Sequence, residues 1–246
     1  MATRVMVLTL ASLWLLTMPA TAETVRIAHP AQLAPFIYVQ DGKTVGLVAD
    51  ILRAAAARED IDIVFVPESI AELQGTLTSG TADALAPAPI GPGRYDFTTA
   101  FVITGGALFV RAPNPAPSGL AELSGKTVIT PEGGPFVSFI RQKFPNVKVV
   151  PTSKSTMTNE YVESLDQVVS GQADAAALNV REGARVVAAS YEGKITVPTT
   201  MFIELSLGLA VAKGQHADLL KRLDAGLAAI RADGTSQRIE DKWKGQ

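Results

Sequence analysis

Charged and polar side chains that could bind a ligand follow two similar segments of the chain. Arg94 closes the run Pro-Ile-Gly-Pro-Gly that begins at residue 89, and Asn179, Arg181 and Glu182 lie just beyond the second segment. A guanidinium can hold a carboxylate through two parallel hydrogen bonds. An Asn side chain offers a carbonyl and an amide but no charge. These two places are therefore candidate contacts for a small polar ligand.

The two similar segments are Ser-Gly-Thr-Ala-Asp-Ala over residues 79–84 and Ser-Gly-Gln-Ala-Asp-Ala over residues 170–175. Each follows a short amphipathic stretch and runs into a small apolar strand. The sequence thus predicts that a helix, a glycine turn and a buried strand are built twice. Two similar lobes that face one another create a cleft, and small ligands usually bind in such clefts between domains.

Strand and helix patterns alternate along the chain, which predicts an α/β protein with mostly parallel sheets flanked by helices. We predict strands over residues 25–28, 61–66, 82–86, 107–111, 126–130, 147–150, 173–178 and 207–212, and helices over residues 47–57, 70–78, 135–143 and within 217–243. The run Pro-Asn-Pro-Ala-Pro at residues 113–117 is the clearest break in composition. We therefore place lobe 1 at residues 23–111, lobe 2 at 112–205, and a return strand with C-terminal helices that pack on lobe 1 at 206–246.

The first 22 residues have the features of a cleaved signal peptide. Arg4 supplies a positive charge, residues 5–18 are largely apolar, and Ala-Thr-Ala at 20–22 is a small-x-small cleavage site. A retained anchor is the less favoured alternative, because the apolar run is short and Pro19 and Glu23 close it. The chain has no Cys that could carry a lipid. We expect export to the periplasm, cleavage before Glu23 and no membrane anchor.

Composition excludes several other classes of function. The chain has 22 Lys and Arg against 24 Asp and Glu, so no basic surface for nucleic acid or an anionic membrane is expected. Without cysteine, stability in an oxidising compartment depends on core packing. We find no metal-ligand spacing, phosphate loop or nucleophile elbow. We therefore expect no cofactor, no metal and no catalysis.

Several short patterns occur in a fixed order after the signal peptide. They are Ala-Pro-Phe-Ile-Tyr (34–38), Asp-Gly (41–42), Val-Gly-Leu-Val-Ala-Asp (45–50), Leu-Thr-Ser-Gly-Thr-Ala-Asp (77–83), Arg94 with Asp-Phe-Thr (96–98), Leu-Ala-Glu-Leu-Ser-Gly-Lys-Thr-Val (120–128), and Ala-Asp-Gly-Thr (232–235) with Lys-Trp (242–243). In this order they resemble the extracellular solute-binding proteins of family 3, the polar-amino-acid receptors of ABC importers. The resemblance implies a periplasmic-binding-protein-like fold of type II, whose two lobes close about a hinge around a small carboxylate-bearing solute. It also implies delivery of that solute to an ABC permease by a monomeric receptor.

The same resemblance implies roles for particular residues. Arg94 would grip the carboxylate of the ligand, and the backbone of Gly133 and Gly134 would add donors at a helix N-terminus. Asn179 stands where amino-acid receptors usually carry Asp, so the ligand lacks an α-ammonium or another acid supplies the charge. Glu132, Glu182 and Glu204 are candidates for that acid. An ordinary structural role remains open for each of these residues.

Further candidates surround the expected cleft. Leu33 and Ile70 occupy the places of aromatic residues that enclose the ligand in relatives, and with Phe36 they would form an apolar wall. The backbone of Ile90 would line the site near Arg94, and His29 would lie at the cleft mouth, where the first strand ends. Aliphatic walls suit a ligand with an apolar portion, although these residues are also compatible with a plain core.

Two alternatives to a receptor remain. The same fold hosts cyclohexadienyl dehydratases, which eliminate water and CO2 from prephenate-like acids, and Glu132, Glu204 or His29 could serve there as general acid or base. The other alternative is a periplasmic accessory protein that has lost small-molecule binding, as the departures from the family pattern would allow.

Overall fold

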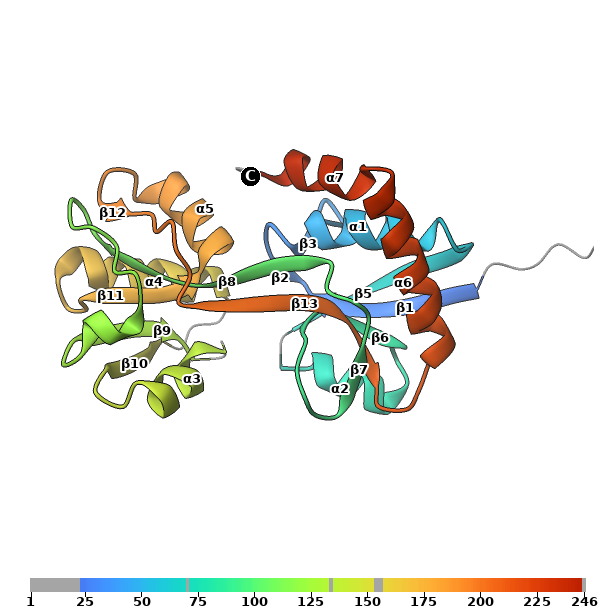
Figure 1. Ribbon diagram of the computed structural model, residues 1–246, viewed down its shortest axis with the longest axis horizontal. Coiled ribbons are helices and arrows are strands. Elements are labelled where there is room, and N and C mark those ends of the chain that lie inside the picture. The colour runs from blue at the N-terminus through green and yellow to red at the C-terminus, as the bar shows by residue number, and fades with distance from the viewer. Residues whose placement is uncertain (1–22, 70, 133–134, 153–156, 245–246) are drawn as a thin grey trace, which may run out of the picture.

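A computed structural model describes residues 23–69, 71–132, 135–152 and 157–244. Two lobes are joined by two long strands, β8 (Val102–Arg111) and β13 (Ile203–Ala212), which we call the crossing strands (Figure 1). The predicted signal peptide, Ile70, Gly133 and Gly134 lie outside the described residues. In the described part of the chain, no helix combines the length and the hydropathy needed to cross a membrane.

Lobe 1 is built on a sheet in the order β13-β6-β1-β5, with β7 also paired to β13. Its strands and helices are β1 (Glu23–Pro30), α1 (Leu47–Ala56), β5 (Ile61–Glu68), α2 (Leu73–Ser79), β6 (Ala84–Pro89) and β7 (Tyr95–Phe97). A small antiparallel sheet joins β2 (Gln32–Leu33), β3 (Ile37–Gln40) and β4 (Lys43–Val45). The parallel pairing of β1 with β5 and β6 follows from the helices that separate these strands.

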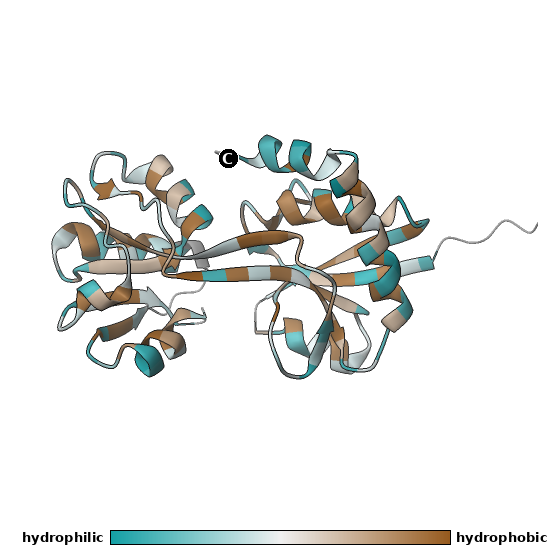
Figure 2. Cartoon of the chain, in the orientation of Figure 1, coloured by the Kyte–Doolittle hydropathy of each residue, from teal (hydrophilic) through white to brown (hydrophobic). Residues whose placement is uncertain are grey.

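The C-terminal helices α6 (Ala217–Ala232) and α7 (Thr235–Trp243) pack on α1 of lobe 1 (Figure 1). Leu223 and Leu227 of α6 belong to the same buried cluster as Ile51 of α1. Gly226 permits the close approach, because a Cβ there would overlap the carbonyl of Ala55. Figure 2 shows hydrophobic residues along the central strands and hydrophilic residues on α7.

Lobe 2 repeats this arrangement on a sheet in the order β10-β9-β11-β8. Its elements are η1 (Leu120–Leu123), β9 (Thr127–Pro131), α3 (Phe136–Lys143), β10 (Lys148–Thr152), α4 (Met157–Ser170), β11 (Ala175–Asn179), α5 (Val180–Ser190) and β12 (Ile195–Thr196). Strand β9 pairs in parallel with both β10 and β11. The predicted α/β class with two lobes is confirmed.

The two similar sequence segments have one structural role in both lobes. Gly80 and Gly171 take left-handed backbone conformations directly after α2 and α4, where a side chain would be strained. Asp83 then accepts the backbone N–H of Arg26 on β1 at 2.9 Å, and Asp174 accepts that of Thr127 on β9 at 2.8 Å. Each Asp therefore fastens its strand to the parallel neighbour. The repetition reflects folding rather than ligand binding.

The crossing strands serve both lobes. One half of β8 pairs with β13, from Val102 opposite Leu207 to Gly106 opposite Ile203. The other half pairs with β11 of lobe 2. The boundary expected from the sequence, after residue 111, therefore assigns to lobe 1 the half of β8 that pairs with β11 of lobe 2. Within the described residues, β8 and β13 carry the chain from one lobe to the other.

Candidate functional site

A cavity of about 140 Å³ lies between the lobes, where the crossing strands pass from one to the other. We call it the cleft cavity, and both lobes and both crossing strands line it. The lining residues are Leu33, Phe36, Pro87 and Pro89 of lobe 1, Thr104, Leu205 and Leu207 of the crossing strands, and Pro131, Pro135, Phe136, Tyr161, Asn179 and Glu182 of lobe 2. Most of these side chains are apolar, and the polar ones come mainly from lobe 2.

Strand alternation creates the apolar wall contributed by β13. Leu205 and Leu207 are two positions apart and both line the cavity, while Glu204, the neighbour that precedes Leu205, faces the other way and is exposed. On lobe 1, backbone hydrogen bonds fix the segment that carries Phe36. The N–H groups of Leu47 and Val48 at the start of α1 donate to the carbonyls of Pro35 and Phe36, at 3.0 and 2.8 Å.

The polar end of the cavity lies at the carboxyl ends of two parallel strands. Pro131 ends β9 and Asn179 ends β11, and helices α3 and α5 begin shortly after them. Parallel α/β sheets commonly bind ligands at this edge. The N-termini of helices present backbone N–H groups and a partial positive charge, which favour ligand oxygens and negative groups.

Asn179 is held in one orientation as the N-cap of α5. Its Oδ1 accepts the backbone N–H of Arg181 and the hydroxyl of Thr104, both at 3.0 Å. With the oxygen thus occupied, the amide group is oriented and Nδ2 is its remaining hydrogen-bonding atom. Asn179 therefore offers a donor to the cavity and favours an acceptor on the ligand.

Glu182 places a buried carboxyl group in the wall of the cavity. Its side chain is one turn along α5 from Asn179, and only 5% of the residue is exposed. The hydroxyl of Tyr161, on α4, donates to Oε2 of Glu182 at 2.8 Å. Burial raises the pKa of Glu182 to about 7, although the hydrogen bond from Tyr161 and the charge of Arg185 oppose this rise. The pKa of the Tyr161 hydroxyl is raised too, first by burial and then by Glu182.

Three of the residues singled out in the sequence line the cleft cavity, namely Leu33, Phe36 and Asn179. Glu182, which we considered as a substitute acid, lines it as well. Ile70, Gly133 and Gly134 fall outside the described residues, so their predicted contacts stay predictions.

The structure does not bring Arg94 to this cavity. Its carbonyl accepts the N–H of Lys213, just beyond the end of β13, at 3.0 Å. Lys213 lies six positions after Leu207 of the cavity wall, which is up to about 20 Å along a strand. The Arg94 side chain is exposed, and its guanidinium lies 5.8 Å from the ring centre of Tyr95.

The other predicted contacts also lie elsewhere. His29 is fully buried, and its Nδ1 donates to the carbonyl of Pro30 at 2.9 Å while Nε2 lies 3.0 Å from the hydroxyl of Thr44. Both ring nitrogens are thus used within lobe 1, and burial lowers the pKa of the imidazole. Ile90 is 39% exposed and Glu132 is exposed, and neither is among the residues that line the cavity.

Sequence reasoning missed Tyr161, Thr104 and the proline-rich walls. Tyr161 lies within the amphipathic stretch before the second similar segment, where an aromatic residue is normally read as core. Thr104 lies in an apolar strand, and no sequence pattern marks it as a residue of the site. Two pairs of prolines, at residues 87 and 89 and at residues 131 and 135, were the available signal for a rigid wall near two strand ends.

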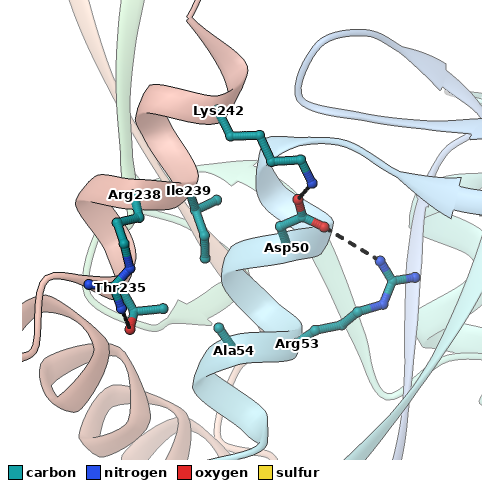
Figure 3. Close-up of a pocket in the computed structure, with 7 residues that line it drawn as sticks. All are labelled: Asp50, Arg53, Ala54, Thr235, Arg238, Ile239 and Lys242. Carbon is teal, nitrogen blue, oxygen red and sulfur yellow. Dashed lines mark hydrogen bonds and ion pairs between the residues drawn. The ribbon is translucent and has the colours of Figure 1, made fainter.

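A second, shallower groove lies between α1 and α7, outside the cleft (Figure 3). Its charged groups contact one another or nearby polar atoms. Lys242 donates to Asp50 at 2.7 Å, Arg53 lies 3.9 Å from the same carboxylate, and Arg238 donates to Thr235 at 2.7 Å. Trp243 also donates its indole N–H to Asp50, at 3.0 Å. These contacts attach α7 to lobe 1, which is a structural role.

Comparison with known proteins finds relatives that match most of this chain. The chain is 25% identical over 91% of its length to the putative amino-acid ABC transporter-binding protein PatH of Vibrio harveyi, and covers 90% of that protein. It is also 25% identical over 92% of its length to the virulence sensor protein BvgS of Bordetella bronchiseptica, but spans only 18% of that longer protein.

Among solved structures, an ancestral arginine-binding protein bound to arginine superposes with a TM-score of 0.72 at 25% identity. The alignment covers 92% of this chain and all of that one. The sequence model of one protein family matches residues 25–246, which is nearly the whole chain after the predicted signal peptide. The chain therefore belongs to the bacterial extracellular solute-binding proteins, family 3.

Proposed function

We propose that this protein is the receptor of an ABC importer, which captures a small carboxylate-bearing solute, an amino acid or a related organic acid. The cleft cavity carries the proposal, because its walls come from both lobes and from the strands that join them. A ligand there contacts both lobes at once and stabilises the closed arrangement. A permease that recognises this arrangement then receives only loaded receptor.

The proposed carboxylate contacts lie at the polar end of the cavity. Nδ2 of Asn179 is one donor, and the predicted backbone donors of Gly133 and Gly134 precede α3. We assign this contact to Asn179 rather than to Arg94, because the Arg94 side chain is exposed beyond the end of β13. The apolar side chains Leu33, Phe36 and Leu205 would hold the non-polar part of the solute.

We further propose a periplasmic location reached through the predicted signal peptide, followed by its cleavage. The family is extracellular or periplasmic, which supports this location. The receptor would act as a monomer without a membrane anchor. N-terminal sequencing of the protein from the periplasmic fraction tests the cleavage site, and Glu23 should be the first residue.

Calorimetric titration with a panel of amino acids and organic acids tests the receptor function. A bulky residue at Leu205 fills the cavity, whereas the same change at Ile103, which is 54% exposed on the neighbouring crossing strand, does not. We expect Leu205→Trp to abolish binding of the solute that wild type binds, and Ile103→Trp to retain it. Equal losses would place the site elsewhere.

Transport requires a cellular test. A strain that lacks the gene should take up the identified solute more slowly, and the wild-type gene should restore uptake while Leu205→Trp does not. Normal uptake without the gene, combined with tight binding by the protein, would contradict delivery to a permease. That result would favour a sensory or accessory role.

The buried acid in the cavity favours one second candidate, a dehydratase of the cyclohexadienyl type. Because its pKa is raised to about 7, Glu182 holds its proton in much of the population near neutral pH. A protonated carboxyl group beside a bound acid can act as a general acid on a leaving hydroxyl. Incubation with prephenate tests this candidate: release of CO2 that Glu182→Gln abolishes would support an enzyme. An unchanged substrate would exclude this reaction.

A further inference from the structure

We propose that Glu182 receives the amine of the solute, and that the solute is a small amino acid with an aliphatic side chain. This inference rests on the receptor function proposed above and names its ligand class. It depends on three features of the cleft cavity: one available carboxyl oxygen, one oriented amide donor beside it, and apolar walls.

The carboxyl group of Glu182 lines the cavity and uses one of its two oxygens in a hydrogen bond to the described residues. Tyr161 donates to Oε2, and among the described residues Oε1 has no hydrogen-bond partner. Glu182 is nevertheless a lining residue, so a ligand can reach this oxygen. A buried carboxylate is stabilised by a cation that donates a hydrogen bond to it. An ammonium group on the ligand supplies both the charge and the donor.

The neighbouring donor matches the other end of an amino acid. Asn179 and Glu182 are three positions apart at the start of α5, so their side chains lie on the same face of one turn. Asn179 presents Nδ2, since its oxygen is used by Thr104 and Arg181. A donor next to an acceptor complements a carboxylate and an ammonium carried by one carbon atom. A simple carboxylic acid can pair only with the donor, Nδ2 of Asn179, and leaves the carboxyl group of Glu182 without a partner on the ligand.

The remaining walls select the side chain of the ligand. Leu33, Phe36, Leu205 and Leu207 present aliphatic and aromatic surface, and the volume is small, about 140 Å³. Among the described residues that line the cavity, Glu182 is the only charged one. A second charge on the ligand would therefore be buried without a partner, at a large cost. The site thus discriminates against amino acids with charged side chains.

The charged and titratable groups around Glu182 are compatible with this role. Arg185 on α5 attracts the carboxylate, and the Tyr161 hydroxyl on α4 donates to it. Glu160 on α4 acts on the Tyr161 hydroxyl, whose pKa it raises. An incoming ammonium favours the ionised form of Glu182, and binding then releases a proton from the protonated fraction. The preference for an amine follows from the contact itself and does not depend on the amount of proton released.

Calorimetry with matched ligands tests the inference. The probes are L-leucine, L-valine and 4-methylpentanoate, which is L-leucine without its amine, and the proteins are wild type, Glu182→Gln and the control Glu192→Gln. Glu192 is an exposed carboxylate just beyond α5 and does not line the cavity. Thermal unfolding of each variant establishes that it is folded.

We expect wild type to bind L-leucine at least tenfold more tightly than 4-methylpentanoate. Glu182→Gln should weaken L-leucine about 100-fold, as expected when a buried ion pair loses one partner, and should change 4-methylpentanoate by less than threefold. Glu192→Gln should change neither. Tyr161→Phe keeps the carboxyl group and should preserve the preference for the amine.

Two results would overturn the inference while leaving the receptor function intact. One is equal affinity of wild type for L-leucine and 4-methylpentanoate, or equal losses for both in Glu182→Gln. The other is binding of a charged amino acid or an amine-free acid in the cleft without binding of L-leucine or L-valine. If no amino acid or organic acid of the larger panel binds, the receptor proposal itself fails.

Discussion

The buried carboxyl group of Glu182 makes a specific prediction about stability without ligand. Its pKa is about 7 in the folded protein, against an ordinary value of 4.5. The folded state therefore holds this proton more tightly than the unfolded state does. Between about pH 4.5 and about pH 7, the folded protein has more protons bound at Glu182, so the free energy of unfolding falls as the pH rises.

The size of the effect follows from the difference in pKa. Each unit corresponds to about 1.4 kcal/mol, so the full contribution of Glu182 is roughly 3 kcal/mol. Solvent screening reduces this little, because only 5% of the residue is exposed. Glu182→Gln keeps an oxygen that can accept from Tyr161 but removes the titration. The variant should therefore gain stability relative to wild type as the pH rises, by roughly 3 kcal/mol between pH 4.5 and pH 8.

The assay is denaturant unfolding of both proteins at several pH values, without ligand. The quantity to plot is the difference in free energy of unfolding between Glu182→Gln and wild type. The wild-type curve alone is not sufficient, because His29 has the opposite effect. Burial lowers the pKa of His29, so its contribution to stability is present above its unfolded value and is lost as the pH falls through the folded value.

Subtraction of the two curves cancels His29 and other distant groups. Glu192→Gln, which changes an exposed carboxylate that does not line the cavity, serves as the control variant. A flat difference curve for Glu182→Gln would refute the reasoning. It would mean that Glu182 titrates at its ordinary value, and hence that the carboxyl group is hydrated or already compensated in the folded protein.

Three further predictions concern the architecture. Asp174→Ala removes the side-chain hydrogen bond from the Thr127 N–H and the ion pair with Lys126, and should cost about 0.5–1.5 kcal/mol in denaturant unfolding, whereas an unchanged free energy of unfolding would mean that these contacts make no net contribution. Gly226→Val forces a side chain into the backbone of α1 and should cost about 1–3 kcal/mol or more; an unchanged melting temperature would contradict the close helix packing. Gly105→Val lies on a crossing strand, where a Cβ overlaps the carbonyl of Ile203, and should alter lobe closure. Small-angle scattering with and without ligand measures that closure, and identical compaction in both proteins would exclude a role for Gly105.

Much of the fold could be predicted from the sequence, because local patterns carry it. Strand and helix alternation, and the repeated Ser-Gly-x-Ala-Asp-Ala segment, specify units in which each helix packs on the strands beside it. The glycines of those segments are needed for a left-handed turn, and the aspartates fix the next strand. These features, with the apolar spacing of the C-terminal segment, were sufficient to predict two lobes and C-terminal helices that pack on lobe 1.

The residues of the candidate site could be predicted only in part from the sequence. Leu33, Phe36 and Asn179, which the order of the motifs along the chain predicted as ligand contacts, line the cleft cavity. Arg94 lies outside this cavity, because it directly precedes β7, and β7 pairs with the far end of β13. No local pattern in the sequence specifies which strand a short segment will join.

The amino-acid sequence by itself determined the class of fold, the repetition of the lobes and the family to which the chain belongs. Only the tertiary structure decided which polar groups meet in the cleft. Tyr161 reaches Glu182 and Thr104 reaches Asn179 from elements far away in the chain. Such contacts are set by helix packing and strand register, and burial created by the whole fold then changes the chemistry of the carboxyl group.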